Sequence, residues 1–150
     1  MRPTNDPSRR DAGPEVLARY IEEAVSPLSF RPSRPPPQCT AAPILAAWKR
    51  KTLFSNRGIA LLALPEEDDP VAFARRIKTP AGKALGYFPF FYEIGLQLVL
   101  WGADVDTADL FAGVDKISTQ RVVLQSIHVI DRMRWDVTSV RTWGQILTGP

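Results

Sequence analysis

The 150-residue sequence has one cysteine, one histidine and no long apolar run. The lone Cys39 excludes an intramolecular disulfide, and one cysteine with one histidine is too small a ligand set for a structural zinc site. No apolar stretch reaches the roughly 18 residues that a membrane-spanning helix needs. Residues 1–12 are polar and show no signal peptide, so we expect a cytoplasmic protein with no membrane contact and no bound cofactor.

Glycine is scarce in the N-terminal third of the chain, whereas proline is concentrated there. Nine of the 14 prolines precede residue 44, and eight of the nine glycines follow residue 57. Residues 1–56 contain nine Lys or Arg and five Asp or Glu, whereas residues 57–150 contain ten and eleven. The basic pI of about 9.3 therefore belongs to the N-terminal third, which argues against a uniformly basic domain.

The N-terminal third predicts an arm attached to a separate body. Residues 1–13 are polar and predict a flexible tail, and residues 14–38 predict a helical arm followed by a proline-rich connector. Gly13 and Pro14 suit the N-cap and first position of a helix over 14–25. Its apolar residues recur at helical spacing, so one face of this helix must dock on something.

The body, residues 39–150 with a sheet core from about residue 57, alternates helical and strand patterns. We predict an α+β domain with a three- or four-stranded sheet and packed helices. Expected strands cover 58–64, 93–101 and 121–131, with 136–147 either helix or strand. Expected helices cover 43–51, a segment from Pro70 interrupted at Thr79–Pro80, and a short stretch at 106–113.

The surplus of apolar side chains on the arm and before the strand 93–101 predicts a small non-catalytic protein that binds a protein partner or assembles with itself. The arm can dock on its own body, on a second copy in a homo-oligomer, or on another protein. An aromatic cluster in the body is the expected receiving surface. The candidate contact residues are Leu17, Tyr20, Ile21, Phe88, Phe90, Phe91 and Tyr92.

Nucleic-acid binding is the first alternative, because two basic clusters are candidates for phosphate contacts. The clusters are Lys49, Arg50 and Lys51, and Arg75 and Arg76 in a stretch that extends to Lys83. A simpler interpretation of Lys49–Lys51 is that cations favour the C-terminal end of the helix expected there.

Metal-assisted catalysis is the second alternative. Asp104 and Asp106 follow a hydrophobic strand, where a carboxylate pair can hold a divalent cation. Asp106 also fits the N-cap of a helix that has Asp109 in its first turn. The other catalytic patterns fail, since Gly82–Lys83 lacks the remaining residues of a phosphate-binding loop and His128 has no carboxylate at a spacing that shares its face. No catalytic residue is therefore predicted.

Overall fold

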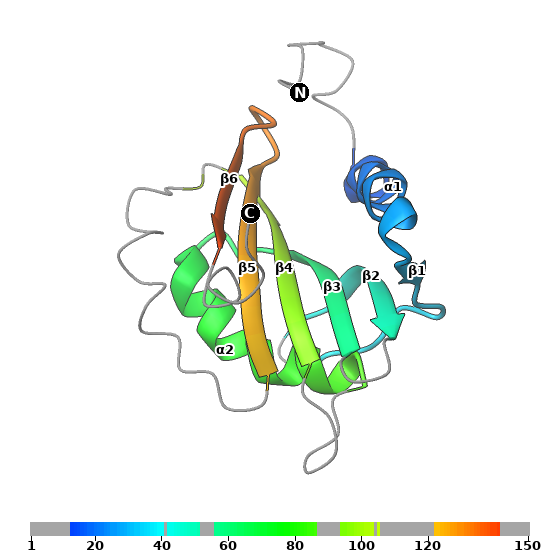
Figure 1. The fold of residues 1–150 in the computed structure, drawn as a ribbon. Helices are drawn as coiled ribbons and strands as arrows, with labels where there is room; N and C mark the ends of the chain where they lie inside the picture. Colours follow the sequence, from blue (N-terminus) through cyan, green and yellow to red (C-terminus); the bar gives the residue numbers. More distant parts are fainter. Residues whose placement is uncertain are drawn as a thin grey trace.

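The computed structural model describes residues 13–40, 42–51, 56–86, 94–103, 105 and 122–141. Six strands form one mixed sheet in sequence order (Figure 1). Strands β3, β4 and β5 are parallel, and the other neighbouring pairs are antiparallel. The elements are α1 (Pro14–Val25), η2 (Ser26–Leu28), β1 (Arg31–Pro32), β2 (Ile44–Lys51), β3 (Asn56–Ala63), α2 (Pro70–Ala84), β4 (Ile94–Gly102), β5 (Val122–Asp131) and β6 (Val137–Arg141).

Both faces of the sheet carry a hydrophobic cluster, and each face has its own helix. We call them the α2 face and the α1 face. On the α2 face, Leu98 and Leu100 of β4 pack with Phe73 of α2. On the α1 face, Leu17 of α1 packs with Trp48 and Leu61. Figure 1 shows α2 against one face of the sheet and α1 beside β1 and β2.

The α+β class is confirmed, but the predicted number of strands is wrong: the sheet has six, not three or four. The segment expected as a helix over 43–51 is strand β2, paired with β3 along its length. Ile44 and Ala47 are buried on the α2 face, whereas Trp48 is buried on the α1 face. A short strand buried on both faces has a near-continuous apolar sequence, and periodicity does not distinguish such a sequence from a helix.

The sequence of the last segment, 136–147, is compatible with helix or strand, and residues 137–141 of it form β6. Besides β2, the second strand that was not predicted is β1, which comes from the connector. Arg31 and Pro32 pair there with Lys49 and Trp48 as a short edge strand. Proline is tolerated on an edge strand, where its missing N–H breaks no ladder hydrogen bond. The expected tail over 1–13 falls almost entirely outside the described residues.

Helix α2 starts where the sequence predicts but does not stop at Thr79–Pro80. The Asp69 side chain accepts a hydrogen bond from the Ala72 N–H at 2.9 Å and caps the helix. The helix then continues through Pro80 to Ala84. Ile77 and Ala81, on either side of Pro80, are fully buried against the sheet, so packing outweighs the cost of an internal proline.

Replacing Pro80 by alanine is therefore expected to stabilise the fold. An alanine restores an N–H that can bond to the carbonyl of Arg76, and the free energy of unfolding should rise by about 1–3 kcal/mol. Urea denaturation monitored by circular dichroism measures the change. The matched variant Pro70→Ala, at the first helical position where proline is favoured, should give no gain; a loss of stability in Pro80→Ala contradicts the explanation.

Helix α1 packs on the sheet of its own chain. Leu17 is 6% exposed, and Ile21 and Val25 are partly buried against the same cluster. The described ranges contain two α-helices, and neither has both the length and the apolar character needed to cross a bilayer.

Candidate nucleic-acid interface

Polar side chains on the α1 face follow the strand register from the end of β2 to β6. Four strand residues belong to the cluster under α1: Trp48, Ile59, Val99 and Ile130. Every second residue of a strand points to the same face, so the polar side chains two or four positions from these residues also lie on the α1 face. The cross-strand pairs are Arg50 with Arg57, Gln97 with Ser126, Ser126 with Arg141, and His128 with Ser139, and Arg57 lies opposite Gly95, which neighbours Gln97 on this face of β4. We call this set the polar strip: Arg50, Arg57, Gln97, Ser126, His128, Ser139 and Arg141.

The polar strip contains three arginines and no carboxylate. Arg50 and Arg57 are half-buried and lie directly opposite each other on antiparallel strands. Like charges in this position are destabilising. Among the ion pairs between described residues, none involves either arginine, so no described carboxylate is paired with them.

The other cations of β1 and β2 face the α2 side at the same end of the sheet. Arg31 is the cross-strand partner of Lys49, and Lys51 shares the face of Lys49. The ammonium of Lys49 lies near Gly86 at the C-terminal end of α2, where the helix dipole favours a cation. Lys49 therefore has a local electrostatic reason to be there, whereas Arg50 and Arg57 have none among the described residues.

The structure divides the first predicted basic cluster between the two faces of the sheet. Arg50 meets Arg57 on the α1 face through the register of β2 and β3, whereas Lys49 and Lys51 face the α2 side, which α2 covers with Arg75 and Arg76 exposed on it. Arg76 forms a salt bridge with Asp68, and its guanidinium lies 5.4 Å from the centre of the Phe73 ring. Arg76 is thus engaged locally and does not extend the strip.

The centre of the strip is a hydrogen-bonded chain of three side chains. Nε2 of His128 lies 2.9 Å from Oγ of Ser126, and Nδ1 lies 2.8 Å from Oγ of Ser139. Ser126 is buried and Ser139 is exposed. Burial of the imidazole, and then the charge of Arg141, lowers the pKa of His128 below its ordinary value. The lowered pKa favours the neutral ring at pH 7.

Only one feature of the sequence favours this histidine as a site residue. Ser126 stands two residues before His128, which puts both side chains on one face of a strand, and this signal was available. Ser139 comes from the next strand, and only the pairing of β5 with β6 brings it to the ring.

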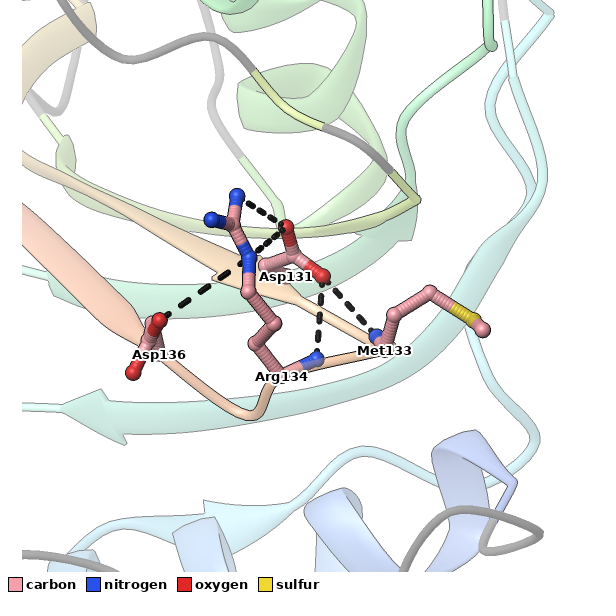
Figure 2. A network of polar contacts seen from close by, with 4 residues as sticks. All are labelled: Asp131, Met133, Arg134 and Asp136. Carbon is pink, nitrogen blue, oxygen red and sulfur yellow. Dashed lines mark hydrogen bonds and ion pairs between the residues drawn. The ribbon is translucent and has the colours of Figure 1, made fainter.

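The turn between β5 and β6 fixes that pairing (Figure 2). One carboxylate oxygen of Asp131 accepts hydrogen bonds from the backbone N–H groups of Met133 and Arg134 at 2.9 and 3.2 Å. The other accepts from Nε and Nη2 of Arg134 at 3.1 and 2.9 Å. Asp131 is 5% exposed. Burial raises its pKa, but the hydrogen bonds from Arg134 and the two N–H groups outweigh burial, and its pKa lies below the ordinary value.

Trp135 completes the turn. Its φ is 59°, in the left-handed region that only turns and similar tight bends normally require. Its indole packs edge to face on Trp101 of β4, with 5.1 Å between the ring centres. The turn is therefore anchored to the sheet, and it holds β6 with Ser139 and Arg141 on the α1 face.

The remaining predicted site residues divide into two groups. On the arm, Leu17 is buried, Ile21 is half-buried and Tyr20 is 45% exposed. The other candidates lie outside the described residues: Phe88, Phe90, Phe91, Tyr92, Asp104 and Asp106. Within the described ranges, no three His, Cys, Asp or Glu side chains converge as metal ligands.

Comparison of the chain with protein-family models, with curated proteins and with solved structures returned no match.

Proposed function

We propose that this protein binds nucleic acid, through contacts of the polar strip with the phosphate backbone. The observation that carries the proposal is the cross-strand pair Arg50–Arg57, two half-buried like charges that form no ion pair with a described carboxylate. An arrangement that costs folding energy is explained if an anionic ligand compensates it. Arginine is well suited to this role because its planar guanidinium pairs with phosphate through two hydrogen bonds.

The extent of the strip favours a polyanion over a single small anion. The arginines stand on β2, β3 and β6 of a sheet ordered by sequence. With strands about 4.8 Å apart, β2 and β6 are separated by about 19 Å. Along the helix axis of a duplex, each strand has one phosphate per about 3.4 Å, so several phosphates span this width.

The uncharged members of the strip suit the same ligand. Gln97, Ser126 and Ser139 supply amide and hydroxyl groups, which in protein–nucleic acid complexes contact phosphate and sugar. Contacts of this kind carry little sequence information, so we propose binding with weak sequence preference. The cytoplasmic location predicted from the sequence is part of the same proposal.

Neutralising the two paired arginines is expected to weaken binding while leaving the fold intact. Arg50→Gln/Arg57→Gln should bind a fluorescently labelled 20-nucleotide strand roughly 10- to 100-fold more weakly at low salt. The slope of log affinity against log salt concentration should become shallower by the amount that about two phosphate contacts contribute. Because the substitutions remove a like-charge pair, the thermal midpoint should stay or rise. Fluorescence anisotropy over a salt series, with single-stranded and duplex probes, measures the effect.

Arg19→Gln is the matched control, since Arg19 is an exposed arginine of α1 that does not belong to the strip. It changes net charge in the same direction and should lower affinity only slightly. If wild type shows no salt-dependent binding to any probe, or if Arg50→Gln/Arg57→Gln is no weaker than Arg19→Gln/Arg75→Gln at equal net charge, the proposal is wrong.

Binding of a protein partner or a second copy is the second candidate. Tyr20 on α1 and Leu28 on η2 are 45% and 57% exposed, and such side chains on consecutive elements favour a contact. Light scattering of the purified chain should then give a mass above 16.7 kDa, which falls in Tyr20→Ser/Leu28→Ser. A monomer at all concentrations removes self-association.

A further inference from the structure

His128 differs from an ordinary surface histidine, because both of its ring nitrogens are hydrogen-bonded to serine hydroxyls, those of Ser126 and Ser139. The distances are 2.9 and 2.8 Å. The two serines come from different strands, and Arg141 is the cross-strand partner of Ser126. His128 is also the single histidine of the chain.

The protonation state of His128 decides how many hydroxyl protons remain for a ligand. In the neutral ring, one nitrogen donates to a serine and the other accepts from the second serine, so one hydroxyl proton is left free. In the imidazolium, both nitrogens donate and both serines accept, so two hydroxyl protons are free. Protonation therefore adds one outward donor and one positive charge at the same place.

We propose that Ser126, His128, Ser139 and Arg141 form a site for a tetrahedral oxyanion, the phosphate group of a nucleotide, and that His128 takes up one proton when the anion binds. The proposal rests on the nucleic-acid binding proposed above, since it assigns one phosphate to a place within the polar strip. In the protonated site, two hydroxyls and the guanidinium can donate to the anion oxygens.

The surroundings of the ring suit proton uptake that depends on the anion. On β4 the residue opposite His128 is Val99, and on β6 the facing groups are Ser139 and the cation Arg141. Among described residues no carboxylate faces the ring, since Asp131 alternates away from it and binds Arg134. Burial and Arg141 both lower the pKa of His128, so the neutral ring is favoured in the free site. The negative charge of a bound anion favours the imidazolium and raises this pKa.

A titration of the lone histidine tests the proposal directly. Proton NMR of the full chain gives one set of imidazole signals, and sulfate is the probe because it keeps its charge of −2 over the whole titration. With sulfate in place of chloride at equal ionic strength, the pKa of His128 should rise by about half a unit or more. Ser139→Ala, at an exposed position, removes one donor and should abolish most of that rise.

Several outcomes overturn the proposal. An unchanged pKa in sulfate shows that no anion binds near His128, and a full rise in Ser139→Ala shows a long-range charge effect instead of a donor site. In Arg50→Gln/Arg57→Gln the pKa of His128 should still rise in sulfate, because those arginines stand on other strands. Loss of the rise in this variant also contradicts an anion site at His128. Oligonucleotide binding at pH 8, where His128 is neutral, tests the proposed function separately from this site.

Discussion

Leu17→Ala is expected to lower the free energy of unfolding by about 3 kcal/mol, the usual cost of removing a buried leucine side chain. Leu17 is the one fully buried residue of α1, and it packs in the same cluster as Phe30 and Trp48. Because α1 docks on its own sheet, the loss should be the same at low and high protein concentration. Urea denaturation at two concentrations, followed by tryptophan fluorescence, measures both points.

Tyr20→Ala on the same helix is the matched control, since Tyr20 is 45% exposed. Its effect on the free energy of unfolding should stay below about 1 kcal/mol. A midpoint that rises with protein concentration in wild type is evidence that the helix docks on a second copy and contradicts docking on its own sheet. Equal losses in the two variants contradict the burial of Leu17 as the cause.

Asp131→Ala is expected to lower the free energy of unfolding by about 2–3 kcal/mol, because the buried carboxylate accepts four hydrogen bonds within the β5–β6 turn. Two of these bonds hold the backbone of the turn, so the variant should also loosen β6. We expect it to weaken the contact of Ser139 with His128, which the imidazole NMR signals report.

The contribution of Asp131 depends on pH in a defined direction. Its pKa is lower in the folded protein than its ordinary value, which is about 3.9 in an unfolded chain. The stabilisation is therefore complete above pH 4–5 and is lost as the pH falls through the lower, folded-state pKa. The difference between wild type and Asp131→Ala should shrink between pH 5 and pH 2 in urea titrations, whereas Asp136→Ala, an exposed neighbour of Arg134, should show a small difference throughout. A difference that grows on acidification contradicts the assignment.

Local chemistry predicted the elements whose pattern is unambiguous. Pro14 and the Asp69–Pro70 pair mark the starts of α1 and α2, because proline at the first helical position lacks an N–H that the helix does not need. The alternating leucines of β4 predicted a strand with one strongly apolar face, and they lie on the α2 face. The predictions failed where neighbours in space decide: β2 has a short apolar sequence compatible with either structure, and Pro80 stays in a helix because the residues around it are buried.

The candidate site was also predicted only in the part that depends on local sequence. Lys49, Arg50 and Lys51 were identified as a basic cluster, but a helix would have placed them at its C-terminal end, where their charges are favourable. In a strand, alternate residues point to opposite faces, so Arg50 separates from Lys49 and meets Arg57 on the α1 face. Ser139 and Arg141 reach His128 through a turn whose geometry depends on a buried aspartate.

The sequence by itself determined the α+β class, the proline-marked helix starts, the apolar strands β3 to β5 and the shortage of cysteine and histidine. These features follow from local conformational preference and from the periodicity of apolar residues, which one chain segment contains in full. Only the tertiary structure decided the six-stranded order, the docking of α1 on its own sheet, and the row of polar groups from Arg50 to Arg141. Cross-strand register is a relation between distant segments, and the charge and proton balance of the polar strip exists only after that register has formed.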